Sequence, residues 1–262
     1  MKIWTLIENT CGRDDLTAEH GLSLYVETGA HKILFDAGQS SVFAENAARM
    51  GIDLAQVDIA ILSHGHYDHG GGLGRFLEIN KTAPVYVSRH AFGRHYNAAD
   101  KYIGLDDSLR VCDRLVFVDD VLALDENLVL YSCNAHTRAF ETPTYGLNRL
   151  ENGVHTPEDF RHEQYLLIRE GEKHVLLSGC SHKGILNIVN WFEPDVLVGG
   201  FHFMKLDAEQ DAEILENAAQ TLLRYRTRYY TGHCTGQAQY ERLREIMGDQ
   251  VSRLSTGVIA EI

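Results

Sequence analysis

The sequence predicts a layered α/β fold, in which two β-sheets pack face to face with helices outside, an αββα sandwich. Strand-like apolar runs alternate with helical segments, and polar residues gather just beyond the ends of those runs in both halves of the chain. With 262 residues, of which 44% are hydrophobic, the chain can bury a large core. No Pro/Ser-rich linker divides it, so we expect a single domain over residues 1–262.

The first third of the chain predicts strands, a helix and a further strand. Apolar runs at 3–8, 22–27 and 32–35 are expected to form a β-meander that closes on Asp36-Ala37-Gly38. A helix should begin after Ser40 or Ser41 as N-cap and end at Gly51. Further along, we expect strands at 57–62 and 84–88, a helix at 72–80 and a less regular region at 89–113.

In the second half, apolar strands repeatedly end in glycine and histidine. These strands are expected at 174–178, 195–198 and 228–231, and helices at 185–192, 207–225 and 237–247. The segment 134–164 contains Pro143, Pro157 and many polar residues, and it predicts a long loop over an active site.

The most informative segment is His64-Gly65-His66-Tyr67-Asp68-His69, which follows a predicted strand and precedes the glycines 70–72. One intervening residue sends the rings of His64 and His66 to the same side of an extended chain. Asp68 and His69 lie past the turn, where they can reach a second metal. Imidazole and carboxylate ligands suit zinc, and also iron or manganese. The segment therefore predicts a site for one or two metal ions.

Charge and composition exclude several classes of function. The formal net charge is 24 minus 37, or −13, which disfavours nonspecific binding to nucleic acid or to an anionic membrane. The apolar run at 3–7 is too short for a signal sequence or a membrane span, so we expect a cytoplasmic protein. Five dispersed cysteines without a Cys-x-x-Cys pair argue for reduced thiols.

The motif His-x-His-x-Asp-His followed by glycine resembles that of the metallo-β-lactamase superfamily. The segments 19–23, 179–185, 199–202 and 232–236 are similar to a subgroup of metal-dependent hydrolases and proteins that resemble dihydropterin-ribofuranosylaminobenzene phosphate synthase. The resemblance covers nearly the whole chain. It implies an αββα four-layer sandwich of the metallo-β-lactamase type.

The resemblance also implies a set of metal ligands. His64 and His66 would bind the first metal, and Asp68, His69 and His233 the second. Many members of the superfamily carry a bridging aspartate at a later strand end. This chain has Gly179-Cys180 there, so the second metal should bind less tightly, and occupancy by a single ion is an alternative.

Residues near this altered strand end are candidates to complete the site. His182 is the preferred third ligand of the first metal, and His136 is the runner-up. Cys180 either contributes a thiolate to the second site or is a small buried residue beside it. His202 is a ligand, a hydrogen-bond donor to a ligand, or a substrate contact.

We also assign candidate catalytic and substrate-binding roles. Asp68 would orient the nucleophile, and His182 or His202 would stabilise developing negative charge or protonate the leaving group. Tyr67 either contacts substrate or packs. Arg138, Arg149 and Arg161 in the predicted loop could bind a phosphate or carboxylate through paired N–H donors, although lid arginines are most often solvated.

Three functions fit these residues. The leading one is hydrolysis by metal-activated water of an ester or phosphoester bond in a small molecule. This substrate either carries a phosphate group or lacks one. The second is transfer from a pterin diphosphate to an aromatic ribosyl phosphate, and the third is a metal-binding sensor. An open coordination position would favour catalysis and a closed one sensing. Exposed aromatic residues at Phe92, Tyr96 and Tyr102 would either form a homodimer contact or roof the pocket.

Overall fold

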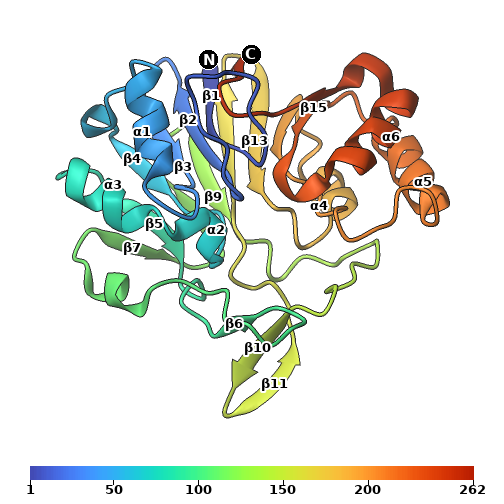
Figure 1. Ribbon diagram of the computed structural model, residues 1–262, viewed down its shortest axis with the longest axis horizontal. Coiled ribbons are helices and arrows are strands. Elements are labelled where there is room, and N and C mark those ends of the chain that lie inside the picture. The colour runs from blue at the N-terminus through green and yellow to red at the C-terminus, as the bar shows by residue number, and fades with distance from the viewer.

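Two large sheets pack face to face in the computed structural model, which describes residues 1–262 (Figure 1). The first has seven strands in the order β17-β1-β2-β3-β4-β5-β7. Its strands are β1 (Lys2–Ile7), β2 (Ser23–Glu27), β3 (Lys32–Phe35), β4 (Ile59–Ile61), β5 (Val85–Ser88), β7 (Leu115–Val118) and β17 (Ile259–Glu261).

The second large sheet also has seven strands, in the order β16-β15-β14-β13-β12-β9-β8. Its strands are β8 (Val121–Ala123), β9 (Leu128–Tyr131), β12 (Tyr165–Glu170), β13 (Lys173–Gly179), β14 (Val196–Gly199), β15 (Arg228–Thr231) and β16 (Val251–Arg253). A small third sheet, in the order β11-β10-β6, lies beyond one end of the two large ones (Figure 1). Its strands are β6 (His95–Tyr96), β10 (Asn148–Glu151) and β11 (Val154–Pro157).

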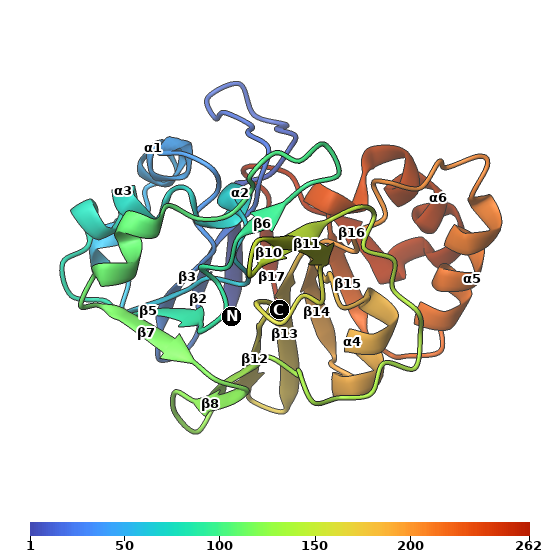
Figure 2. The ribbon, with the colours of Figure 1, turned by 90° about the horizontal axis from the view of Figure 1, so that it is seen from below.

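Helices cover the outer face of each large sheet (Figure 2). On the first sheet these are α1 (Val42–Arg49) and α3 (Leu73–Ile79), and on the second α4 (Ile185–Phe192), α5 (Ala212–Leu222) and α6 (Gln237–Met247). The single turn α2 (Tyr67–Gly70) follows β4 and carries Asp68 and His69. Short 3₁₀ helices occur at Leu54–Gln56, Asp107–Val111, His233–Thr235 and Gly248–Gln250. This arrangement confirms the predicted αββα fold class.

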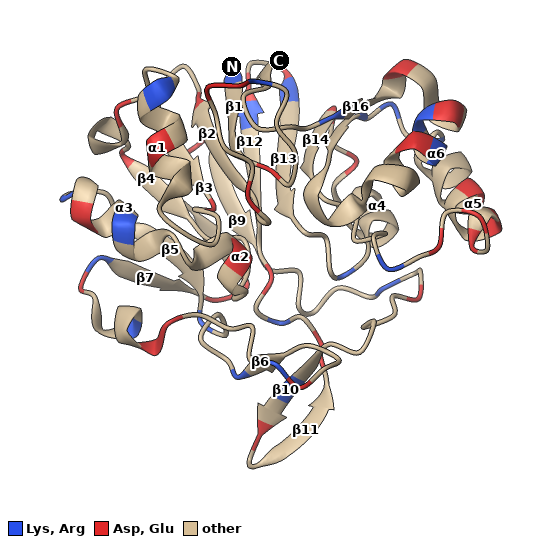
Figure 3. Cartoon of the chain, in the orientation of Figure 1, with Lys and Arg blue, Asp and Glu red and all other residues tan.

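Side chains that alternate along the strands build three separate apolar cores. In β3, Ile33 and Phe35 face the second sheet, whereas Leu34 between them packs toward α1 and α3. In β13, Val175 and Leu177 face the first sheet, and Leu176 packs toward α4, α5 and α6. Because successive strand residues point to opposite faces, each sheet can bury both faces. The four layers therefore follow from strands that are apolar on both faces. Charged residues concentrate on the outer helices and loops (Figure 3).

Parallel pairing brings the carboxyl ends of several strands to one edge. β3 pairs with β4 in parallel, and β13, β14 and β15 also pair in parallel. The segments that follow these strands begin at Asp36, Leu62, Cys180, Gly200 and Gly232. Functional side chains that are far apart in the sequence therefore meet at this edge.

Residues 134–164 differ from the long loop that we expected. The hairpin formed by β10 and β11 lies within this segment, and it turns at Asn152 and Gly153, which both have positive φ. Asn-Gly is the strongest short sequence signal for such a turn. The strands are mostly polar, β10 being half-buried and β11 largely exposed, so the hydrophobic pattern alone does not reveal them.

Two further expectations need correction. Phe92 is buried at 7% exposure and packs edge-on against Phe117, so it is not an exposed aromatic residue. The helix expected from residue 207 begins only at Ala212, because the Asp207 carboxylate accepts bonds from the backbone N–H groups of Glu209 and Gln210 and forms a turn. No helix of the structure has the length and apolarity needed to cross a membrane.

Two glycines near the start of α3 provide a matched test of the packing. A Cβ at Gly72 would lie 2.1 Å from the Ala37 carbonyl oxygen and 2.6 Å from that of Ser40. A Cβ at Gly74 meets nothing closer than 3.9 Å. We expect Gly72→Ala to destabilise the fold by about 1–3 kcal/mol and Gly74→Ala to stabilise it by up to about 1 kcal/mol. Urea unfolding in the presence of a chelator measures both, and equal midpoints would contradict the packing.

Candidate metal centre

Fourteen histidines occur in the chain, and the carboxyl edge of the sheets gathers seven of them into one buried cluster around His64. They come from the segments after β4, β14 and β15, the turn after β13, the strand β6 and the loop before β12. The members are His64, His66, His69, His95, His162, His182 and His202, and His233 joins them through His69.

The first candidate metal site consists of His64, His66 and His182, whose ligand atoms lie within 4.8 Å of one another. Burial holds the pKa of each ring well below its ordinary value of 6.5, so the rings are neutral near pH 7. A neutral imidazole has a lone pair for a metal. The structure thus brings together the two ligands of the His-x-His pair and the preferred third ligand, His182.

The hydrogen bonds around His64 fix which of its nitrogens can bind a metal. The Ser63 hydroxyl donates to Asp36 Oδ2 over 2.7 Å, so its oxygen accepts the proton on His64 Nδ1 at 2.9 Å. Nε2 of His64 therefore carries a lone pair, and it lies 3.3 Å from Nε2 of His182. Two ligands about 2.0 Å from a tetrahedral zinc ion would be about 3.3 Å apart. The pair fits one edge of such a site.

The second candidate site consists of His69, His233, Asp68 and Cys180. His69 Nε2 lies 3.2 Å from His233 Nε2 and 3.1 Å from Cys180 Sγ, and His233 Nε2 lies 3.3 Å from Asp68 Oδ2. His69 donates through Nδ1 to Asp36 Oδ2, and His233 donates through Nδ1 to Asn9 Oδ1. Both Nε2 atoms are therefore free to bind a cation.

Without a cation, these facing nitrogens need a proton between them. Burial by itself lowers the pKa of His69, but the Asp36 carboxylate outweighs burial and raises this pKa to about 9. Burial also opposes ionisation of Asp68, but the rings of His20 and His233, 3.4 Å and 3.3 Å from its Oδ2 atom, hold the pKa of its carboxyl well below the usual value. A metal ion would replace the proton of His69 and be neutralised by the Asp68 carboxylate. The donor set of two imidazoles, a carboxylate and a sulfur fits zinc well.

Cys180 lies between the two sites. Its sulfur lies 3.1 Å from Nε2 of His69 and within 4.8 Å of a ring nitrogen of His64. It therefore stands between the two candidate sites, at the strand end where the resemblance implied a bridging aspartate. Burial raises the pKa of the Cys180 thiol, so a bound cation is needed to stabilise its thiolate.

Buried carboxylates that sequence reasoning missed hold the ligands in place. Asp36 accepts from Ser63 N–H, the Ser63 hydroxyl and His69 Nδ1–H. Glu8 accepts from the backbone N–H of His233 over 2.6 Å, and Glu163 accepts from that of His182 over 2.6 Å. All three carboxylates are at most 2% exposed. Asp36 stands directly after a predicted strand and Glu8 is the last residue of another, and this position is the signal that could have found them.

His95 and His162 form a third group with His66, which sequence reasoning also missed. His162 Nδ1 accepts the N–H of Gly65 at 2.9 Å, so the neutral ring carries its hydrogen on Nε2. His162 thus offers a donor and not a metal ligand. His95 donates through Nδ1 to Glu158 over 2.7 Å. Neither residue stands in a motif, so only the fold identifies them.

Backbone strain concentrates at the metal centre. Several non-glycine residues there have positive φ, namely Asp36, Phe160, Ser181, His202 and His233. Such conformations cost roughly 1–3 kcal/mol each and persist only where the surrounding structure enforces them. The Phe160 ring stacks on His182 at 4.8 Å and 8°, which fixes the plane of this ligand.

The structure places the other candidate residues at different distances from the ligands. The ring of His202 is 4.3 Å from that of His182, and neither of its buried nitrogens has a hydrogen-bond partner. His136 packs against Trp191 and joins none of the ligand groups, so the structure favours His182 over this runner-up. Tyr67 is half-buried, and the Lys101 ammonium lies over the Tyr67 ring, 5.5 Å from its centroid.

The predicted arginines are already paired with protein groups. Arg138 donates to the backbone carbonyl of Asp159, and Arg161 donates through Nε and Nη2 to the Asp159 carboxylate. Arg149 also pairs with Asp159. Arg149 and Arg161 line a separate cavity of about 190 Å³ with His95. Their role in binding substrate stays a prediction, and substrate would have to replace these partners.

The metallo-β-lactamase superfamily model matches residues 16–233, most of the chain. The chain belongs to the metallo-β-lactamase superfamily. A crystal structure described as a metal-dependent hydrolase of this superfamily matches with a TM-score of 0.82 and 28% identity, covering 100% of this chain and 99% of the other. Zn²⁺-bound PqqB from Methylobacterium extorquens, at 11% identity and a TM-score of 0.58 over 100% of both chains, shares the fold.

Two curated relatives of this superfamily member come from Methanocaldococcus jannaschii. 7,8-Dihydropterin-6-methyl-4-(β-D-ribofuranosyl)-aminobenzene-5′-phosphate synthase is 27% identical over 99% of this chain and 96% of its own length. An uncharacterised protein is 29% identical over 76% of this chain and 78% of its own. The match to the superfamily model and the match to this synthase confirm the resemblance that the motifs indicated.

Asp36 offers a test of how the ligands are held. Asp36→Asn has nearly the same shape but cannot accept from Ser63 and His69 with a full negative charge. We expect zinc affinity to fall about 10- to 100-fold, as when other groups that orient metal ligands are changed. Competition with a chromophoric chelator measures this, and circular dichroism checks the fold. Asp14→Asn, at an exposed position, is the control. Equal affinities of the two variants would contradict the role of Asp36.

Proposed function

We propose that this protein is a metal-dependent hydrolase that uses water to cleave an ester or phosphoester bond of a small molecule. The observation that carries the proposal is the first site, where His64, His66 and His182 supply three nitrogens. Catalytic zinc sites have three protein ligands and keep a fourth position for water or substrate, whereas structural sites are closed by four. A sensor that closed both sites against water would need a fourth ligand here.

Each part of the centre contributes differently to hydrolysis. A bound cation lowers the pKa of water from about 15.7 to about 7 and so supplies hydroxide at neutral pH. Asp68 stays ionised between His20 and His233, and its carboxylate can orient the nucleophile. His202 can donate a proton to the leaving group or stabilise negative charge, because both of its nitrogens lack partners.

Zinc is the metal that this donor set favours. Three imidazoles at the first site, and imidazole, carboxylate and thiol at the second, are typical zinc ligands. Both large sheets contribute ligands, so metal binding should also stabilise the packing between them.

A second candidate function is transfer rather than hydrolysis. The observation that favours it is the match to a dihydropterin-ribofuranosylaminobenzene phosphate synthase along nearly the full length of both chains. In that case a second organic molecule would take the place of water as nucleophile, and the same metal centre would stabilise the leaving group.

Matched histidine variants test the metal centre. We expect His64→Ala to lose most zinc from the first site and to lower turnover at least 100-fold, because a lone-pair donor disappears from a buried site. His136→Ala, which removes a histidine outside the cluster, should retain both. Elemental analysis after purification without chelator, and assays of phosphodiesters, phosphomonoesters, thioesters and lactones, give the two readouts. Full zinc content and turnover in His64→Ala would exclude this assignment.

The two candidate reactions differ in their need for a second organic substrate. We expect the zinc-loaded protein to hydrolyse at least one ester or phosphoester in water alone, with ¹⁸O from labelled water appearing in one product. A pterin diphosphate and an aromatic ribosyl phosphate should not be required together. If mass spectrometry detects product only when both are present, transfer is the reaction and hydrolysis is excluded.

A further inference from the structure

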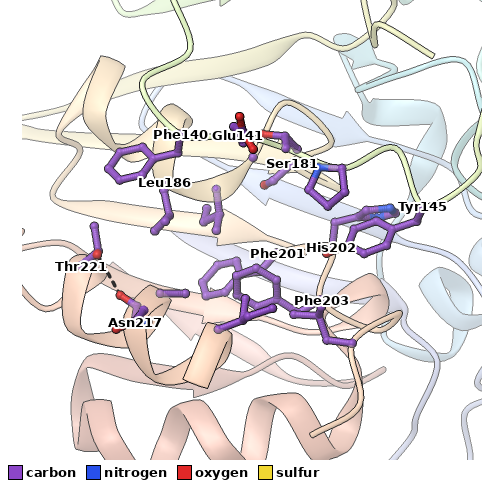
Figure 4. A pocket seen from close by; sticks show the side chains of 17 residues that line it. Phe140, Glu141, Tyr145, Ser181, Leu186, Phe201, His202, Phe203, Asn217 and Thr221 are labelled. Carbon is purple, nitrogen blue, oxygen red and sulfur yellow. Dashed lines mark hydrogen bonds between the residues drawn. The ribbon is translucent and has the colours of Figure 1, made fainter. Parts of the chain in front are cut away.

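A cavity of about 480 Å³ opens beside the metal centre (Figure 4). Its walls come from residues 140–145, the beginning of α4, the segment after β14 and one side of α5. The volume lies within the range of roughly 300–1,000 Å³ that is common for small-molecule sites. None of the predicted substrate-binding residues Tyr67, Arg138 and Arg161 lines it.

The cavity lies next to the first candidate metal site. Ser181 and His202 line it; Ser181 precedes the ligand His182 in the sequence, and the His202 ring packs against the His182 ring. The ring of His202 stands 4.3 Å from that of His182 and 5.6 Å from that of Tyr145, which lies beside it at one side of the cavity (Figure 4). A molecule in the cavity would therefore extend past His202 to reach the metal ligands.

The chemistry of the walls selects the part of a molecule that fits. Phe140, Tyr145, Phe201, Phe203 and Leu186 supply aromatic and aliphatic surface. The lining contains no lysine or arginine, and its only carboxylate is that of Glu141.

Both threonine hydroxyl groups in the walls already have protein acceptors. Thr142 donates to the Lys183 carbonyl, and Thr221 donates to that of Asn217. An anionic group would find no positive partner here, whereas an apolar ring would displace water from apolar surface.

We propose that the substrate carries an uncharged aromatic or similarly broad apolar group, which binds in this cavity while the scissile bond lies at His182 and His202. This inference rests on the proposed function, because it defines the substrate of the same centre. His202 then marks the boundary between the apolar cavity and the reacting bond. The arginine-lined cavity beside His95 is too polar for such a group.

The test uses zinc-loaded protein and substrate pairs that share one scissile group. Methyl 2-naphthoate is compared with methyl acetate, and methyl 2-naphthyl phosphate with dimethyl phosphate. After correction for rates in alkaline solution, we expect kcat/KM to be at least about 100-fold higher for the naphthyl member, since even one methylene in an apolar pocket changes kcat/KM by roughly 10- to 200-fold.

Two variants of α5 locate the effect. Asn217 lines the cavity at an exposed position, so Asn217→Phe should fill the mouth without disturbing the core. Gln220→Phe adds the same side chain to an exposed position of α5 that does not line it. We expect the naphthyl preference to fall at least 10-fold in Asn217→Phe and to remain in Gln220→Phe.

Direct binding separates this inference from the proposed function. Calorimetric titration with 2-naphthol, which has no bond to hydrolyse, should show at least 10-fold weaker binding to Asn217→Phe than to the wild type and Gln220→Phe. That result supports the cavity even if no ester is cleaved, in which case only the hydrolase proposal fails. Equal binding to all three proteins, no binding, or turnover without naphthyl preference would overturn the inference.

Discussion

The metal centre depends on buried ring nitrogens that face one another. His69 and His233 each donate a hydrogen bond through Nδ1 and leave their Nε2 atoms 3.2 Å apart. Nε2 of His64, which also carries a lone pair, lies 3.3 Å from Nε2 of His182. Two acceptors this close in a dry environment repel unless a proton or a cation lies between them. The buried carboxylates of Glu8, Asp36 and Glu163 keep this arrangement in place. Each carboxylate lies next to one strand, and the ligand that it holds lies next to another.

The two metal sites are not equivalent. The first has three imidazoles and faces the apolar cavity through His182 and His202. The second has four donors of three kinds, and Cys180 stands where a carboxylate bridge would otherwise add negative charge. In the proposed hydrolase, the first site would carry the reaction and the second would support it. The arginine-lined cavity lies beside His95 and the apolar cavity beside His202, so the centre has two chemically distinct neighbours.

Local patterns along the chain are sufficient to predict the layered fold and to select the candidate ligands that it brings together. Apolar strands alternate with amphipathic helices. The residues His64, His66, Asp68 and His69 are so close in the sequence that one short segment carries all four side chains. His182 and His233 could be added because they follow apolar strands in the same way. Polar or short strands such as β10 and β16 carry no such pattern, since pairing with a neighbouring strand defines them.

Which distant residues share the site depends on the packing of the two sheets. Glu8, His95, His162 and Glu163 stand in no motif, and their roles arise from hydrogen bonds to residues 19 to 225 positions away in the chain. The same holds for the apolar cavity, which is built from segments that no periodicity connects. Local sequence fixes which way a side chain leaves its strand, but the groups that it meets are set only when the two sheets come together.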